Sequence, residues 1–322
     1  APCGPSGLAW FGSPVSALLG VHAFPSSFEV SEDMHATTAR PLWLGRGSSR
    51  ALKQLAHRLG SPPPLRAAGS HALTRPVPGT LTLLRCSAGD VYLLGTAHVS
   101  TESERRVRQL VKDVRPSLVF VELCSTRARA LMGSGGVDAV LPALPEPLGR
   151  MYEVFQRLFA SGRDMRAAVE EAQALGVPVV HGDLPVETTM QRLQASVVGT
   201  GILPLLGRMA RAPPPPPAMA GLVAAVQKSP LELEQAINKF MVRENLKALT
   251  GYMEATVPEV MQVMLHDRDD HMAAELASDR VLRQGQAPQQ RGVVAIVGLA
   301  HMEGIEQRWR DRFGDGSVHP IE

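Results

Sequence analysis

The sequence predicts an α/β protein whose mixed central sheet begins with a hairpin, is covered by helices and carries a large helical insertion. Three observations predict this fold class. Short apolar runs alternate with amphipathic stretches, a tight turn joins the first two runs, and mainly helical patterns fill the long interval before the last run. The 322 residues are enough to bury a substantial core.

A long N-terminal segment without regular structure is expected to precede the sheet. Residues 1–78 are rich in Pro, Gly and Ser, and they include the proline clusters Ser61–Pro64 and Arg75–Pro78. Such stretches are typical of disordered linkers. We therefore expect one folded domain over residues 79–315 and a short C-terminal tail over residues 316–322.

The first predicted elements of the domain are a β-hairpin and a helix. Leu81–Cys86 and Val91–Leu94 are strand-like runs joined by a Ser-Ala-Gly-Asp turn. Thr101 and Glu104 then match a capping box, which predicts a helix that runs to about Val114.

Further apolar runs predict three more strands, separated by helices. The helix Met165–Leu175 is amphipathic and is followed by Gly176, the residue type preferred just after a helix end. Two or three helices are expected within residues 218–283, the most strongly patterned over His266–Arg283, and a final helix is expected from about Glu303. The three strands are predicted at Ser117–Cys124, Val177–Val180 and Gly292–Val297.

Composition narrows the classes of function. The net charge is +2 and aromatic residues make up 4% of the chain, so we expect no nucleic-acid partner. The three cysteines are widely spaced and odd in number, which indicates reduced thiols in an intracellular protein, in the cytoplasm or facing the cytosol on an organelle membrane. No transmembrane segment is evident, since the apolar stretch Leu193–Leu206 is short and interrupted.

Four predicted strands end in side chains that can take part in chemistry. Two of the histidines share a G-x-A-H context, with Gly95 before His98 and Gly298 before His301. In open α/β sheets, reactive groups collect at the carboxyl ends of strands, and a glycine there lets the backbone turn sharply or approach a ligand. The strand-end groups are His98, Glu122, His181 with Asp183, and His301.

Two neutral imidazoles and one carboxylate are a known ligand set for a divalent metal that keeps an open position for water. The set favours Zn, Mn, Co or Fe and does not distinguish them. Asp183 or His181 would complete the ligand shell or orient a ligand histidine. The other interpretations remain open: each histidine caps a helix or bonds locally, and Glu122 is one half of a buried ion pair.

Arg268 is a further candidate, on the helix that starts near His266. It either binds an anionic group in the pocket or pairs with Glu122, while the acidic residues around it are also typical of a solvated helix start. The sequence contains no G-x-S-x-G elbow, no P-loop and no H-E-x-x-H motif.

Three blocks of the sequence form a distinctive set, namely Leu94–Ser100, Val119–Cys124 and Val297–Ile305. They resemble the signature blocks of the TraB/PrgY family, and two further blocks, around Met165–Pro185 and Asp267–Ala273, also match. The resemblance spans about residues 80–313.

The resemblance implies an α/β fold similar to that of the Tiki metalloproteases, the erythromycin esterases and the ChaN haem-binding lipoproteins. It implies a metal site at His98, Glu122 and His301, with Arg268 and Asp183 as supporting residues. Many relatives continue into C-terminal membrane helices, so membrane association is expected only through segments that this chain does not contain.

Two hypotheses follow. The first is a metal-dependent hydrolase of peptide or amide bonds, in which the two histidines and Glu122 hold the ion and Arg268 stabilises developing negative charge. The second is a non-catalytic protein that binds a peptide, haem or another small molecule, or that acts as a membrane-associated regulatory scaffold.

Overall fold

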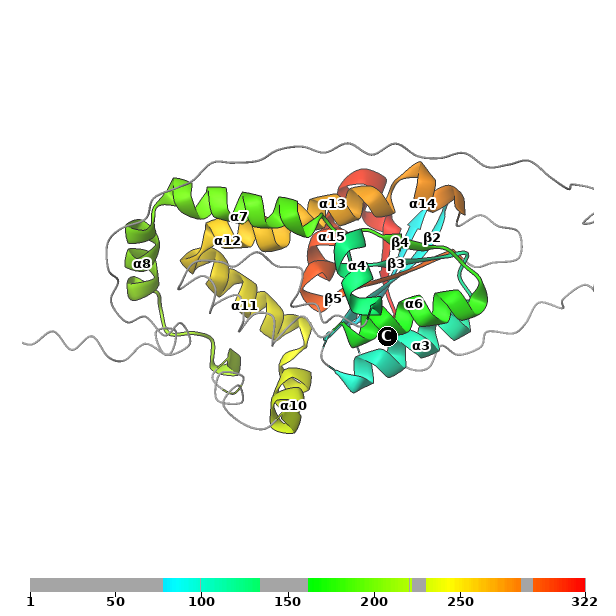
Figure 1. Cartoon of the computed structure of the whole chain (residues 1–322), viewed down its shortest axis with the longest axis horizontal. Coiled ribbons are helices and arrows are strands. Elements are labelled where there is room, and N and C mark those ends of the chain that lie inside the picture. The colour runs from blue at the N-terminus through cyan, green and yellow to red at the C-terminus, as the bar shows by residue number, and fades with distance from the viewer. Residues whose placement is uncertain are drawn as a thin grey trace, which may run out of the picture. The chain divides into compact units, whose positions relative to one another are not determined.

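The computed structural model describes residues 78–98, 100–133, 162–219, 221, 230–284 and 292–321 (Figure 1). The segment over residues 1–78 that we expect to be disordered falls almost wholly outside the described residues. The described residues form a sheet and the helices attached to it.

A mixed sheet forms the centre of the described part of the chain, with six strands in the order β4-β3-β5-β2-β1-β6. Strands β2, β5, β3 and β4 run parallel to one another, whereas β1 runs antiparallel to both of its neighbours. This arrangement confirms the predicted α/β class with an initial hairpin. The strands are β1 (Leu81–Cys86), β2 (Gly89–Thr96), β3 (Leu118–Val121), β4 (Val179–His181), β5 (Val293–Gly298) and β6 (Val318–Pro320).

The hairpin is tighter than the sequence indicates. Its register pairs Leu81 with Leu94 and Cys86 with Gly89, so only two residues lie between the paired ends. Gly89 has a φ of 146°, a conformation that side chains other than glycine rarely adopt, and this lets the second strand begin directly after the turn.

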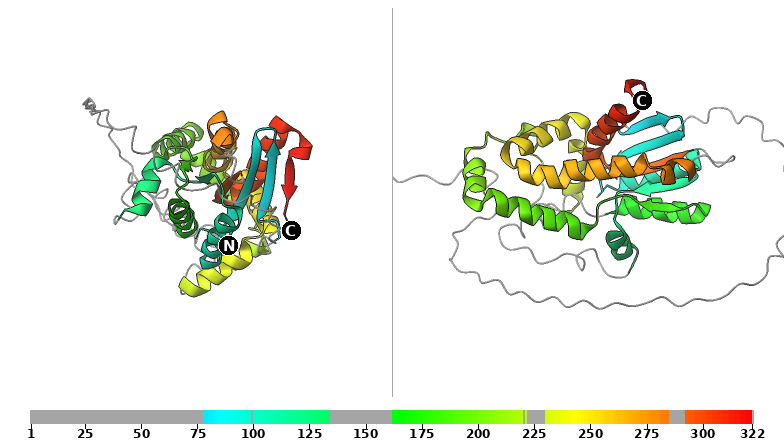
Figure 2. Two further views of the ribbon diagram at one scale, coloured as in Figure 1. Left: turned by 90° about the vertical axis from the view of Figure 1, so that its right-hand side faces the viewer. Right: turned by 90° about the horizontal axis from the view of Figure 1, so that it is seen from above.

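The predicted C-terminal tail is wrong in one respect, because part of it is a strand. β6 pairs with β1 from Thr82↔Pro320 to Leu84↔Val318, and Figure 2 shows it beside the hairpin. The domain therefore extends past residue 315. A strand of three residues is too short to give a readable alternation of apolar and polar residues, so sequence patterning does not reveal it.

The sheet is covered by helices on both faces, and the strands alternate accordingly. On β3, Leu118 and Phe120 pack into one apolar cluster and Val119 and Val121 into the other. The first cluster is covered by α13 (Asp267–Leu276), α14 (Asp279–Gln284) and α15 (Leu299–Phe313); the second is covered by α3 (Thr101–Val114), α4 (Ser125–Met132) and α6 (Arg163–Leu175).

Several predicted helix starts differ from the observed ones, among them that of α6, which begins at Arg163 and not at Met165. The α3 helix is capped by the Ser100 side chain, which accepts a hydrogen bond from the backbone of Ser103, so the cap lies one residue before the expected Thr101. The α15 helix begins at Leu299 and not near Glu303, because the helix follows β5 without an intervening loop. His301 therefore lies in the first turn of a helix.

The predicted helical insertion is present between β4 and β5, and it is larger than the sequence indicates. Part of it packs around a third apolar cluster that includes Met190, Leu193, Val257 and Val260. No helix within the described ranges is long and apolar enough to cross a membrane. The insertion contains α7 (Val186–Thr200), α8 (Ile202–Arg211), α10 (Pro230–Phe240), α11 (Arg243–Thr256), α12 (Pro258–Met261) and a π-helix, η2 (Gln262–His266).

Candidate functional site

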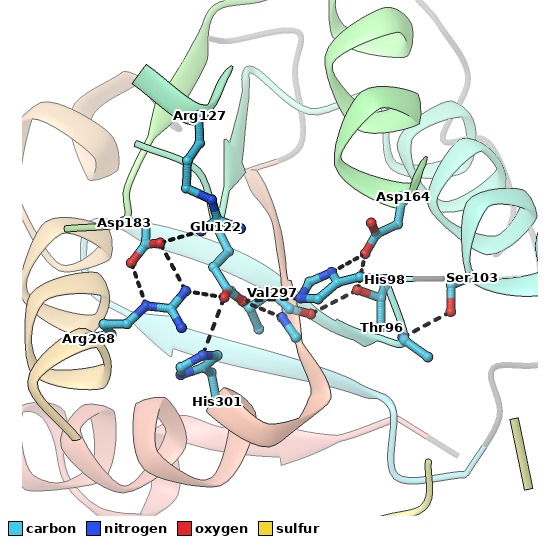
Figure 3. A network of polar contacts seen from close by, with 12 residues as sticks. Thr96, His98, Ser103, Glu122, Arg127, Asp164, Asp183, Arg268, Val297 and His301 are labelled. Atoms are coloured by element: carbon cyan, nitrogen blue, oxygen red, sulfur yellow. Dashed lines mark hydrogen bonds and ion pairs between the residues drawn. The ribbon is translucent and has the colours of Figure 1, made fainter. Parts of the chain in front are cut away.

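A buried cluster of charged side chains lies at the carboxyl ends of the parallel strands (Figure 3). His98 follows β2, Glu122 follows β3, Asp183 follows β4, and His301 comes three residues after the end of β5. Arg268 reaches the same cluster from α13. Because the carboxyl ends of parallel neighbours lie at one edge of a sheet, segments that are far apart in the sequence meet here.

Glu122 is the centre of the cluster, and its side chain is 3% exposed. Its carboxylate oxygen Oε2 accepts a hydrogen bond from the backbone N–H of Gly298 at 2.6 Å. The Nε2 atoms of both histidines face this carboxylate: His301 lies 3.3 Å from Oε1 and His98 lies 3.9 Å from Oε2. Arg268 also donates to Oε1.

The loop after β2 places His98. The backbone N–H of Ala97 donates to the Ser103 hydroxyl at 3.1 Å, which fixes the loop against the first turn of α3. The Nδ1 atom of His98 then lies 2.9 Å from Oδ2 of Asp164, at the start of α6. The hydroxyl of Thr96 donates to the same Asp164 oxygen.

His301 is held in a similar way. Its Nδ1 atom lies 2.6 Å from Oδ1 of Asp269, which is on α13 next to Arg268. Both carboxyl partners are buried: Asp164 is 0% exposed and Asp269 is 1% exposed. Each histidine therefore has a carboxylate at Nδ1 and the shared Glu122 beyond Nε2.

Arg268 is bound by two carboxylates. Its guanidinium donates to Asp183 through Nε at 3.0 Å and through Nη2 at 2.9 Å, and it also donates to Glu122. Arg127 adds a second cation at Asp183, at 2.9 Å. The sequence leaves two roles open for Arg268, binding of an anionic group or pairing with Glu122. In the structure, Arg268 forms the ion pair with Glu122.

A π-helix precedes Arg268. The carbonyl oxygen of Met264, within η2, accepts a hydrogen bond from Arg268 Nη1 at 3.2 Å. Single π-helical turns inside α-helices occur frequently at functional sites.

The charges in the cluster shift its pKa values in opposite directions. Burial raises the pKa of Glu122, but the charges of His301 and Arg268 outweigh burial and hold this pKa well below its usual value. Burial lowers the pKa of His301, but Glu122 and Asp269 raise it to about 9. For His98, burial likewise lowers the pKa, and Asp164 and Glu122 raise it above the usual value. In the metal-free protein, His301 therefore carries a proton at neutral pH.

The glycines of the two G-x-A-H segments make room for this packing. A Cβ atom at Gly298 would lie 2.9 Å from His98 Nε2 and 3.2 Å from Glu122 Oε2. A Cβ atom at Gly95 would overlap Met302 and Leu299 of α15. The reason for glycine at these positions is thus close approach of side chains, and not a left-handed backbone.

The structure brings together most of the predicted site residues and adds others. His181 is exposed on β4, and burial of part of the ring lowers its pKa. The expectation that Asp183 or His181 would orient a ligand histidine is wrong, because Asp183 faces two arginines and the residues at Nδ1 are Asp164 and Asp269. These two aspartates and Arg127 were not predicted: each lies on a helix, and only the tertiary packing brings it to the strand ends.

The donor set of the cluster is compatible with a divalent metal, since it contains two imidazoles and a carboxylate. Within the described ranges, no three His, Cys, Asp or Glu side chains are already spaced as a metal shell. The nearest approach to one is Glu122 with the Nε2 atoms of His98 and His301. Arg268 and Gly298 also bind the Glu122 carboxylate, so a metal would share this carboxylate with them.

Fold and site together define an α/β protein with a mixed sheet, in which two glycine-histidine segments and a glutamate meet at the strand ends. The chain belongs to the TraB/PrgY/gumN family, whose model matches residues 82–311. It is 24% identical over 230 residues to an uncharacterized protein of Methanocaldococcus jannaschii, covering 67% of this chain and 52% of that protein.

TraB domain-containing proteins of mouse and human are also similar. Each is 24% identical over 265 residues, which covers 72% of this chain and 66% of the relative. The chain thus spans between about half and two thirds of the length of the curated relatives it matches.

Proposed function

We propose that this chain is a metal-dependent hydrolase that cleaves peptide or amide bonds at the buried cluster. One observation carries the proposal: the Nε2 atoms of His98 and His301 both face Glu122, at 3.9 Å and 3.3 Å, while each Nδ1 atom is engaged by its own aspartate. Histidines that ligate metals in proteins are commonly oriented in this way, with a carboxylate on the other ring nitrogen.

His98, Glu122 and His301 would hold the metal. When bound there, the metal would lower the pKa of a coordinated water and supply a nucleophile near neutral pH. The two histidines and the glutamate correspond to the ligand set of several zinc hydrolases. Its nitrogen and oxygen donors do not distinguish zinc from manganese, cobalt or iron.

The remaining charges support this assignment. Against burial, the charges of His301 and Arg268 hold the pKa of Glu122 well below its usual value. Asp183 and Glu122 together balance the buried guanidinium. The backbone N–H of Gly298, at the start of α15, donates to the Glu122 carboxylate, so this anion lies at a helix N-terminus, where the helix dipole stabilises negative charge. Since His301 is protonated at neutral pH without metal, metal binding would release a proton.

A ligand-binding protein without turnover is the second candidate. It is favoured by the ion pair between Arg268 and Glu122, which compensates the buried carboxylate without any metal. In this case the cluster would recognise a peptide or small molecule, or stabilise a regulatory domain.

A cytosol-facing location is part of both proposals. Cys86 and Cys124 are free thiols, and unpaired cysteines are typical of reducing compartments. Fractionation of cells that express the full chain, followed by labelling of the two thiols, would contradict this location if both are recovered oxidised.

Metal titration distinguishes the two candidates. The purified chain would be stripped with a chelator, titrated with Zn²⁺, Mn²⁺ and Co²⁺ by calorimetry, and then incubated with a peptide mixture to detect cleavage. We expect one equivalent of metal and metal-dependent cleavage. Both should be lost in His98→Ala and in His301→Ala.

His181→Ala is the matched control, because His181 also lies at the end of a strand but is exposed and outside the cluster. It should bind metal as tightly as the wild type. A wild-type chain that folds but binds none of these three metals, nor Fe²⁺ in a parallel anaerobic titration, would contradict the hydrolase proposal and favour the binding protein.

A further inference from the structure

We propose that Asp164 and Asp269 are positioning residues, which hold the rings of His98 and His301 so that both Nε2 atoms point at Glu122. The consequence for metal binding rests on the function proposed above. The orientation itself does not, since it is a property of the metal-free chain.

The same arrangement occurs at both histidines. A buried carboxylate lies at Nδ1 of each ring, 2.9 Å away for His98 and 2.6 Å for His301. The two aspartates come from different helices, α6 and α13. A carboxylate at Nδ1 keeps the proton on that nitrogen, and in the neutral ring this leaves the lone pair on Nε2.

The Asp164 carboxylate is itself fixed by the strand that carries His98. Thr96 is the last residue of β2, and its hydroxyl lies within hydrogen-bond distance of Asp164 and, at 3.1 Å, of the Val297 carbonyl oxygen on β5. Asp164 also lies in the first turn of α6, where the helix dipole stabilises negative charge. The position of the His98 ring is therefore tied to two central strands and to a covering helix.

The Asp269 carboxylate occupies space that Gly304 leaves open. A Cβ atom at Gly304 of α15 would overlap Oδ2 of Asp269. Asp269 and His301 thus meet only because α15 has no side chain at this position. A substitution at Gly304, on the neighbouring helix, can therefore displace the Asp269 carboxylate without removing its charge.

The charge of each aspartate is essential to this role. In Asp164→Asn or Asp269→Asn the side chain keeps its size, but its amide nitrogen can donate to Nδ1 and thereby move the ring proton to Nε2. A neutral ring whose proton lies on Nε2 has no lone pair on that nitrogen with which to bind a metal. Loss of either carboxylate should therefore affect one histidine and leave the other unchanged.

Nuclear magnetic resonance of the full metal-free chain, labelled with heavy nitrogen in histidine and recorded above the pKa of about 9 of His301, where that ring is neutral, reports directly which ring nitrogen carries the proton. The spectra of His98→Gln and His301→Gln assign the two rings. In the wild type we expect a slowly exchanging, strongly hydrogen-bonded proton on Nδ1 of both rings. Asp164→Asn should remove that signal for His98 only, and Asp269→Asn or Gly304→Ala should remove it for His301 only.

Glu170→Gln and Asp270→Asn are the matched controls, since each removes an exposed carboxylate from the same helix as one of the aspartates. Both controls should leave both signals in place. Once the two rings are assigned, the wild-type spectrum is a test that needs no aspartate variant to fold: a bare Nδ1 on His98 or His301 would overturn the proposal for that ring. Signals that persist in the two Asp→Asn variants would overturn it as well.

Metal affinity provides the second readout. If the proposed function is correct, each Asp→Asn variant should bind Zn²⁺ about 10- to 100-fold more weakly than the wild type, as is typical when the partner of a ligating histidine is removed. If the wild type binds no metal, the proposed function fails while the resonance test of the positioning role still stands. If the wild type binds Zn²⁺ and both Asp→Asn variants bind it equally well, the aspartates do not position the histidines for a metal, and this part of the proposal is overturned.

Discussion

Replacing His301 by glutamine should flatten the pH dependence of folding stability on the alkaline side. Burial lowers the pKa of His301, but Glu122 and Asp269 raise it from 6.5 to about 9. Because this folded-state pKa lies above the unfolded value, the folded protein binds the proton more tightly. The resulting stabilisation is complete below pH 6.5 and is lost as the pH rises through about 9.

The magnitude follows from the same pKa difference. At about 1.4 kcal/mol per pKa unit, the rise corresponds to about 3 kcal/mol of folding free energy. The His301 side chain is only 6% exposed, so solvent screening reduces this value little. Urea unfolding of the metal-free wild type at about pH 6 and about pH 10 measures the loss, and subtraction of the same difference for His301→Gln removes the contribution of other titrating groups.

His181→Gln is the control, since burial alone acts on His181 and lowers its pKa. This variant should keep the alkaline loss of stability seen in the wild type. The reasoning would be refuted if the wild type and His301→Gln lost the same free energy of unfolding between the two pH values.

Four other changes test the buried ion pair, the packing of two glycines and the edge strand. Glu122→Gln should lower the free energy of unfolding by about 3 kcal/mol. This is the lower end of the range for breaking a buried ion pair, because Asp183 still binds Arg268. Urea unfolding measures the loss, and a change below about 1 kcal/mol would contradict the expectation. Gly182→Ala should cost about 1–3 kcal/mol in thermal unfolding, because its Cβ would overlap the Phe120 ring, which must shift. Gly251→Ala, in a helix with no neighbouring atom within 4 Å of the added Cβ, should instead raise stability by about 0.5–1 kcal/mol. Deletion of residues 318–322 removes β6 and exposes the edge of β1, so melting should occur at lower temperature with more aggregation, and an unchanged melt would argue against the pairing.

The strand ends of the candidate site could be predicted from the sequence. Apolar runs located β2, β3 and β5, and each run was followed by His98, Glu122 or the Gly298–His301 segment. Parallel strands bring such ends together, so local patterning was sufficient to predict that these groups are close. A carboxylate directly after an apolar strand was also correctly expected to need a buried partner, and Arg268 is one.

The helix-borne part of the site could not be predicted in the same way. Asp164 lies near a helix start, where acidic residues are common because the helix dipole stabilises their negative charge. Asp269 is one of three acidic residues in the first turn of α13, and nothing in the local sequence distinguishes it from the more exposed Asp270. Which of them faces His301 depends on how α13 packs against α15.

The position of β5 has a consequence for the order in which the protein is assembled. This strand lies between β2 and β3 in the sheet, yet it is separated from both by more than 170 residues of chain. During synthesis of the polypeptide, β2 and β3 cannot pair with each other directly. Each can pair with β5 only after that strand has been synthesised, near the end of the chain. Such distant pairing slows folding and leaves strand edges exposed to aggregation until it is complete. The same late segment brings Gly298 and His301, so the centre of the sheet and the candidate site both depend on β5 and the residues that follow it.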